Sequence, residues 1–163
     1  MEKAAQRINT SPDEGEDLNE LGLFDLPTFY IGMIQNENFS NIAQILRPYG
    51  LIPVEWRVLA HLQHHDGQGI GELATLCLVK HSAMSVLTRS MEDKGFVKRV
   101  QDSKDHRITR VHLTAHGEAK CDEIMPPILK HQLSLVTDLS ADELADLVRM
   151  LKIVYGRVKG AQK

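Results

Sequence analysis

The spacing of apolar residues changes from a helical to a strand period within Gly69–Gly117, and this change limits the folds open to the chain. In the segment His81–Lys94, one helical face carries apolar or weakly polar residues at the i, i+3, i+4 and i+7 positions: Met84, Leu87, Thr88 and Met91. Two strand-like runs follow, Phe96–Gln101 and Ile108–Leu113, with a loop between them. The pattern predicts a helix-turn-helix followed by a β-hairpin.

The opposite face of the His81–Lys94 helix carries small or basic side chains. These are Ser82, Ser85, Val86 and Arg89, groups that the major groove of duplex DNA can admit. The simpler alternative is an ordinary solvent-exposed helix face. The preceding turn-and-helix context favours groove contact for the set as a whole.

The loop between the two predicted strands, residues 102–107, is rich in charge. Lys104, His106 and Arg107 have the reach and charge to contact phosphates or a minor groove. Loop charges are also commonly just solvated. Asp105, two residues before Arg107, either holds the arginine in a fixed pose or merely occupies the loop, and both interpretations stay open.

The same stretch resembles the MarR family of winged-helix transcriptional regulators. The resemblance rests on Leu73-Ala74, MEDKG, FVKR, DSKDHR and VHLTAHG, with a D-x-x-D-x-R wing followed by L-T-x-x-G, and covers Leu51–Gly117. It departs from the family at three positions. Leu78 stands where the turn usually has Gly, Lys80 where a Ser or Thr helix cap is usual, and Val86 where an Arg is common. No base preference is therefore carried over.

The flanking segments have helical patterns. Helices are predicted over Leu26–Leu46 and Pro53–His64, and a long one begins after Thr114. A short helix over Gly71–Cys77 is predicted to bury Leu73, Ala74 and Leu76. The pair Pro126-Pro127 is expected to kink or interrupt the long helix because each proline lacks an N–H. Ser140-Ala141-Asp142-Glu143 is a capping box that starts a last helix with an apolar stripe.

These terminal helices are too few to bury one another, which suggests pairing with a second copy of the chain. The resemblance agrees, since terminal helices make the dimer interface in the family. The expected fold is mainly α with a small β-hairpin wing, a winged helix-turn-helix head on a helical dimerisation platform. The expected segments are a mobile acidic N-terminal segment (1–21), an N-terminal dimerisation helix (22–50), the winged helix-turn-helix (51–117) and C-terminal dimerisation helices (118–163).

Charge is distributed unevenly along the chain. The net charge is −3, yet residues 51–116 hold nine Lys and Arg against seven Asp and Glu, and seven of the eight histidines. Residues 1–50 hold three basic residues against eight acidic ones. The predicted head is thus the positive part of the chain, and a few well-placed cations are expected to provide affinity for DNA.

Other classes of protein receive little support. There is no apolar run of membrane-spanning length and no signal peptide, so no membrane association and a cytoplasmic location are expected. Catalytic motifs are missing, so neither an enzyme nor a cofactor is expected. His61 with His65, and His112 with His116, have spacings that can share a metal ion, but a third ligand is not identifiable, so no metal is assigned. Cys77 and Cys121 fit small buried apolar residues.

Four residues of the first two helices suggest a site for a small effector. They are Tyr30, Trp56, Arg57 and His61. Regulators that the chain resembles often bind small aromatic acids or phenols where the head meets the platform, between an arginine and aromatic walls. Trp56 taken alone is better explained by core packing.

The expected function is that of a dimeric, sequence-specific DNA-binding transcriptional regulator. It would act as a repressor on a pseudo-palindromic double-stranded operator and be modulated by a small aromatic acid or phenolic effector. Two alternatives stay open: a winged-helix protein-interaction module without an operator, and a histidine-bound metal sensor.

Overall fold

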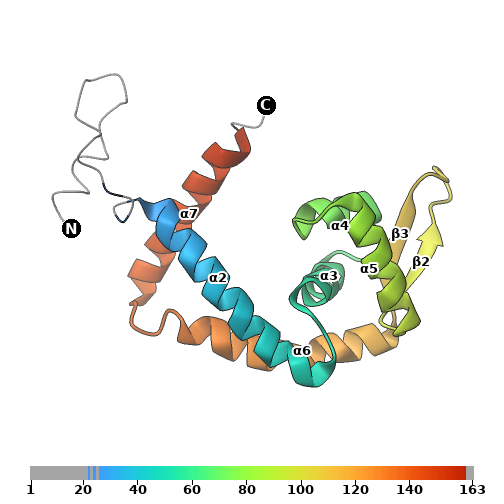
Figure 1. Ribbon diagram of the computed structural model, residues 1–163, viewed down its shortest axis with the longest axis horizontal. Coiled ribbons are helices and arrows are strands. Elements are labelled where there is room, and N and C mark those ends of the chain that lie inside the picture. The colour runs from blue at the N-terminus through green and yellow to red at the C-terminus, as the bar shows by residue number, and fades with distance from the viewer. Residues whose placement is uncertain (1–21, 23, 25, 161–163) are drawn as a thin grey trace. The chain divides into compact units, whose positions relative to one another are not determined.

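The computed structural model describes residues 22, 24 and 26–160 of the chain. The predicted mobile segment 1–21 lies outside the described residues. Contacts divide the chain into two compact units, Met1–Pro53 and Val54–Lys163. In the first unit, helix α2 (Pro27–Leu46) begins with a proline in its first turn and is followed by the 3-10 turn η3 (Arg47–Tyr49) (Figure 1). A proline is tolerated in a first turn because the N–H it lacks has no helical partner there.

The second unit holds the helix-turn-helix, the wing and two longer helices. In chain order its elements are α3 (Pro53–His64, whose first residue closes the first unit), β1 (Gln68–Gly69), α4 (Ile70–Leu76), α5 (His81–Asp93), β2 (Val97–Gln101), β3 (Thr109–Leu113), α6 (Ala115–Ser134) and α7 (Ala141–Gly160). The predicted helices and strands are present, with ends that differ by a residue or so. The expected fold class, mainly α with a small β-hairpin wing, is confirmed.

The strands form one small antiparallel sheet in the order β1-β3-β2. Strands β2 and β3 pair from Val97 opposite Leu113 to Gln101 opposite Thr109. Strand β1 adds only Gln68 and Gly69 to the other edge of β3. The hairpin is thereby joined to the segment just before α4, so the wing and the helix-turn-helix form one body.

The core of the second unit lies beneath α5 and the sheet. Met84, Thr88 and Met91 of α5 are fully buried, as their common helical face predicted. The hydroxyl of Thr88 donates to the carbonyl of Met84 at 3.0 Å, so its burial leaves no unmet donor. One predicted core residue is wrong: Leu76 is 44% exposed. Cys77 is buried instead, because α4 ends at Leu76 and the chain turns there.

Two hydrogen bonds join α3 to the other helices. Lys94, at the end of α5, donates to the buried carboxylate of Glu55 at 2.7 Å. Gln63 donates to Asp122 of α6 at 3.1 Å. Glu55 is 2% exposed, and a carboxylate is retained at such a depth only with a charged or hydrogen-bonding partner.

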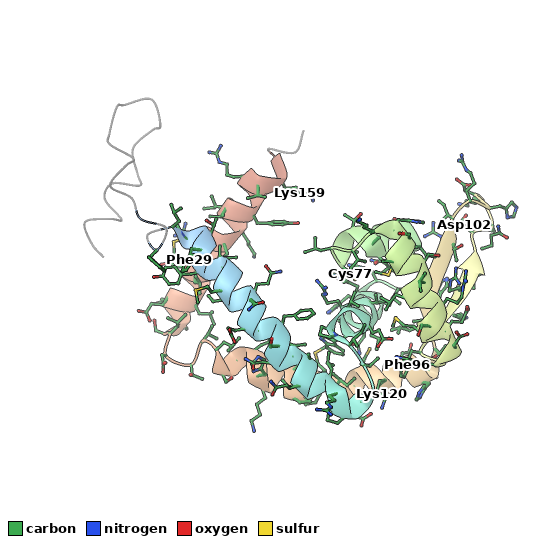
Figure 2. The ribbon with its side chains drawn as sticks, in the orientation of Figure 1. Phe29, Cys77, Phe96, Asp102, Lys120 and Lys159 are labelled. Carbon is green, nitrogen blue, oxygen red and sulfur yellow. The ribbon has the colours of Figure 1, made fainter. Side chains whose placement is uncertain are left out.

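The L-T-x-x-G motif forms the junction between the wing and α6. Thr114 caps α6 by accepting a hydrogen bond from the Gly117 N–H at 3.0 Å, and its hydroxyl donates to the Gly95 carbonyl at 2.6 Å. A Cβ on Gly117 would lie 2.1 Å from the carbonyl oxygen of Phe96. Only glycine permits this close approach of α6 to the chain that enters β2. Figure 2 labels Phe96 at this junction.

Helix α6 continues through Pro126 and Pro127, so of the two predicted outcomes the interruption is wrong, while the kink stays a prediction. Each proline removes its own helical hydrogen bond, but its fixed φ is compatible with the helix. Ile124 and Ile128, on either side of the pair, are 0% and 6% exposed. Burial on both sides holds the two halves in one helix although the sequence alone favours a break.

Apolar side chains on α2 and α7 remain exposed in the single chain. Among the described residues, α7 has none that is buried and α2 buries only Leu46. The capping box that starts α7 is present: the Glu143 N–H donates to the Ser140 hydroxyl at 3.4 Å, and the Ser140 N–H donates to the Glu143 carboxylate at 2.8 Å. No helix within residues 26–160 has by itself the length and apolar character to cross a membrane; α4 and α5 pass that test only as a bent pair, by length and composition.

Candidate nucleic-acid interface

The helix-turn-helix consists of α4 and α5, between which the chain bends by 107°. This value lies within the range of about 90–120° typical of the motif. Leu78, in the turn, has a φ of +56° and is 77% exposed. A left-handed conformation costs a non-glycine residue about 1–2 kcal/mol, which is the physical reason why glycine suits this position better.

The N-terminus of α5 has only backbone capping. Lys80 occupies the N-cap position, and within the described part of the chain its side chain makes no capping hydrogen bond. The Lys80 carbonyl accepts from the Met84 N–H at 3.0 Å. The predicted departure from a Ser or Thr cap therefore leaves the first turn of α5 without a side-chain acceptor.

The four helix residues predicted to contact DNA differ in exposure. Ser82 and Arg89 are exposed, and Val86 is exposed by 69%, although it is apolar. Ser85 is partly buried. The four residues thus comprise three small side chains and one cation, which suits close approach of α5 to base edges. Direct contact with DNA stays a prediction for each of them.

The wing loop is organised by Asp102, which Figure 2 labels near the end of β2. Its carboxylate accepts hydrogen bonds from the N–H groups of Lys104 at 2.8 Å and Asp105 at 3.0 Å, and it pairs with Arg110. The Asp105 N–H, the Arg110 guanidinium and the Lys104 N–H together hold the pKa of Asp102 well below its usual range. Arg110 also donates to the Gly67 carbonyl at 2.9 Å, which joins the wing to the segment before β1.

The structure decides between the two interpretations of Asp105, a residue that holds Arg107 in place or one that merely occupies the loop. Arg107 donates from Nε to Oδ1 and from Nη2 to Oδ2 of Asp105, both at 3.0 Å, while its side chain remains 90% exposed. The Arg107 guanidinium and N–H lower the pKa of Asp105. Asp105 therefore holds Arg107 in one pose with the cation directed into solvent. Lys104 and His106, the other predicted wing contacts, are also exposed.

A hollow of about 280 Å³ separates the first turns of α4 and α5 from the wing. Its lining comes from the start of α4, from α5 and from the two wing strands with their loop: Ile70, Gly71, His81, Ser85, Arg99, Arg107, Ile108 and Thr109. Two of the predicted residues, Ser85 and Arg107, therefore face one space. The sequence patterns did not predict a role for His81 or Arg99. The one sequence signal for Arg99 was the alternation of side chains along a strand, which places Arg99 and Lys98 on opposite faces.

The four residues predicted for an effector site lie on two helices, one in each unit. Tyr30 lies on α2 in the first unit and is 51% exposed, while the other three lie on α3 in the second unit. Trp56 is 7% exposed, in agreement with core packing. Arg57 and His61 are partly buried. Burial lowers the pKa of His61, and the nearby positive charge of Arg57 lowers it further. The effector site stays a prediction.

The histidines and cysteines have ordinary structural surroundings. His112 bonds to Asp66 at 2.8 Å, and His116 stacks on Phe96 at a ring separation of 5.1 Å. Among the residues that the structure describes, His, Cys, Asp and Glu form no group of three or more able to hold a metal. Both cysteines are free and fully buried, and burial raises the pKa of each thiol, to about 11 for Cys121. Such thiols are unreactive.

A helix-turn-helix whose second helix packs beside a hairpin wing defines the winged-helix class. Within that class, residues 49–108 match the sequence model of the MarR family. The HTH-type transcriptional repressor MdtR of Bacillus subtilis (strain 168) is 30% identical over 92 residues, which are 55% of this chain and 59% of MdtR, less than two thirds of that relative.

Solved structures agree with this match. A MarR family transcriptional regulator from Silicibacter pomeroyi superposes with a TM-score of 0.78 at 24% identity, covering 88% of this chain and 97% of that one. A cysteine-to-serine mutant of MarR from E. coli, complexed with operator DNA, gives a TM-score of 0.72 at 25% identity, covering 82% of this chain and 99% of that one. Residues 49–108 thus match the MarR family of transcriptional regulators, and the chain has the winged-helix fold of the solved MarR-family structures.

Proposed function

We propose that the protein is a dimeric repressor that binds a pseudo-palindromic operator through α5 and the wing. The observation that carries this proposal is the shared hollow, which is lined both by Ser85 of α5 and by Arg107 of the wing. The two elements predicted to contact DNA thus border one space. Arg107 is already held in an exposed pose by Asp105, so little side-chain entropy is lost when it binds a phosphate or enters a minor groove.

Dimerisation is supported by the apolar side chains that a single chain leaves in water. On α7, Leu147, Leu151 and Tyr155 are 36%, 42% and 67% exposed. A continuous apolar face of this kind on a monomer is unusual and marks an interaction surface. Two copies joined through it would present two α5 helices, and a dimer reads half-sites about one helical turn apart.

The test is a titration of the purified protein with DNA from upstream of its own coding region, at several salt concentrations. Each phosphate neutralised contributes about 0.9 to the slope of log K against log salt, so Arg107→Ala should lower the slope of a dimer by about 1.8. Arg149→Ala is the matched control, since Arg149 is also exposed and paired with an aspartate, Asp146, but lies on α7. An unchanged slope for Arg107→Ala, or equal loss in both variants, contradicts the wing contact. Failure of the wild type to bind favours the protein-interaction alternative.

An effector would act by binding the DNA-incompetent state more tightly than the DNA-bound state. We infer a small aromatic acid or phenol, because Arg57 and His61 are partly buried on one face of α3 beside the buried Trp56. Trp56 is the single tryptophan of the chain, so its fluorescence reports on this region alone. Binding of such an acid should change the fluorescence in the wild type and leave it unchanged in Arg57→Met. Equal responses in the two proteins contradict the site.

A further inference from the structure

The side chain of Arg99 has an unmet hydrogen-bonding group beside the hollow between α5 and the wing. Its Nε is buried, and among the described residues it has no hydrogen-bond partner. The backbone N–H of Arg99 donates to Glu92 at 2.7 Å, so the main chain at this position is fixed. A buried guanidinium N–H without a partner is rare in folded proteins and needs an explanation, such as a ligand that the free chain lacks.

The lining of the hollow favours an anion as that ligand. Its lining residues include Arg99, Arg107, His81, Ser85 and Thr109, and no Asp or Glu. Asp105, which pairs with Arg107, lies outside the lining. Arginine with nearby hydroxyls is the donor set that recognises a phosphate through charge-assisted, often forked hydrogen bonds.

The position of the hollow identifies the source of the phosphate. A helix in the major groove and a wing in the adjacent minor groove lie on either side of the sugar-phosphate strand that separates the two grooves. That strand must cross the space between α5 and the wing. The hollow occupies this space, with α5 contributing His81 and Ser85 and the wing contributing Arg99 and Thr109.

We propose that this hollow binds one phosphate of the operator backbone in each half-site, and that Arg99 is its principal ligand. The inference rests on the proposed function, because it needs α5 and the wing to engage adjacent grooves. A phosphate held at this point would fix the register of α5 along the duplex, while base contacts supply the sequence preference. Arg99 is thus a positioning residue for recognition.

The test replaces single phosphates of the half-site by neutral methylphosphonates and measures affinity for wild type and Arg99→Gln. A hydrogen bond to a charged partner corresponds to about a tenfold change in affinity per half-site, hence about a hundredfold for a dimer. The wild type should lose this affinity when one particular phosphate is replaced. Arg99→Gln should bind every duplex more weakly than the wild type, and its affinity should not fall further when that same phosphate is replaced. Arg99→Lys keeps the positive charge but not the forked guanidinium, so its affinity should lie between those of the wild type and Arg99→Gln.

Lys98→Gln is the matched control, because Lys98 is an exposed cation on the opposite face of β2. It should reproduce the wild-type methylphosphonate profile. The melting temperature of Arg99→Gln should equal or exceed that of the wild type, since Nε has no partner to lose within the described structure. A lowered melting temperature assigns Arg99 a structural role and overturns the proposal.

The remaining outcomes are also decisive. If the wild type binds its operator but Arg99→Gln retains the full profile, the phosphate site is wrong and the proposed function stands. If inorganic phosphate binds the wild type and not Arg99→Gln, but no single methylphosphonate weakens operator binding by the wild type, the hollow is a site for free anions and the backbone assignment fails. If no duplex binds, both proposals fail together.

Discussion

Replacement of Gly117 by alanine tests the junction on which the wing and α6 depend. The new Cβ would lie 2.1 Å from the carbonyl oxygen of Phe96 and 3.0 Å from Cδ2 of Leu113. Leu113 is a flexible side chain and can move, but the Phe96 carbonyl is backbone. It would have to retreat by roughly 0.9 Å even to reach 3.0 Å, a separation below which real Cβ contacts essentially never occur.

The energetic consequence follows from two terms. Forced overpacking of this kind costs about 1–3 kcal/mol. The shift also disturbs the cap that Thr114 provides to α6 and its bond to the Gly95 carbonyl, and loss of a cap costs about 1 kcal/mol. We expect Gly117→Ala to lower the free energy of unfolding by about 3 kcal/mol. For a chain of this length the melting temperature should fall by about 6–12 °C.

The assay is thermal unfolding followed by circular dichroism at one fixed protein concentration, since a dimer's melting temperature depends on concentration. Gly71→Ala is the control, because a Cβ on this helical glycine would meet its nearest neighbour, His81, at an ordinary 3.8 Å. The control should melt at or slightly above the wild-type temperature. A Gly117→Ala protein that melts within 2 °C of the wild type, a margin of about half a kcal/mol, would refute the argument.

Further substitutions probe the turn, the cap, the buried ion pair and the wing. Leu78→Gly should raise the free energy of unfolding by about 0.5–1 kcal/mol, because the relief of a left-handed φ exceeds the entropy gained by the unfolded chain; a lowered melting temperature contradicts this. Lys80→Ser should add about 1 kcal/mol by capping α5, and no gain in thermal unfolding would show that the cap position is misassigned. Lys94→Met should destabilise the protein by about 2–3 kcal/mol in denaturant unfolding, because Glu55 stays buried without its lysine; wild-type stability would show that the pair is unimportant. Asp102 has a lowered pKa, so its stabilising effect is present above about pH 4 and is lost as the pH falls further. Asp102→Asn should therefore destabilise the wing near pH 7, and the difference should shrink steadily as the pH falls below about 4, as measured by hydrogen exchange of the Asp105 amide; a pH-independent difference would contradict this.

Much of the fold could be predicted because the signals are local. The i, i+3, i+4, i+7 spacing of Met84, Thr88 and Met91 defines one side of α5, and these residues are buried. Capping at Thr114 and Ser140 places the starts of α6 and α7. Such patterns depend on residues within one or two turns, so the rest of the fold is not needed to interpret them.

Two local arguments gave the wrong result where packing opposes local preference. Leu76 fits a buried helical position by spacing, but α4 ends there and the side chain is 44% exposed. Pro126 and Pro127 oppose a helix locally, yet burial of Ile124 and Ile128 maintains it. At Pro126 and Pro127 the burial of the flanking isoleucines outweighs the local preference for a break, whereas Leu76 is exposed where the helix ends.

The candidate interface was predictable in part. The wing motif predicted the role of Arg107, and the helical spacing predicted the small outward residues of α5. The fork between Asp105 and Arg107 was one of two open interpretations, because adjacency in a loop does not fix side-chain geometry. Arg99 was missed, because the burial of its Nε, which has no partner within the described part of the chain, depends on how α4, α5 and the wing pack together.

The sequence by itself determined the order and nearly all the bounds of the helices and strands, and the resemblance of the head to the MarR family, including the turn position at which Leu78 replaces the usual Gly. These properties are encoded in short-range spacing and in individual residues. The tertiary structure alone decided the burial of Glu55 against Lys94, 39 residues away, and the 2.1 Å approach that forbids a Cβ on Gly117. It also decided that α5 and the wing border one cationic hollow. Contacts between residues distant in sequence depend on how whole elements pack, which no local pattern specifies.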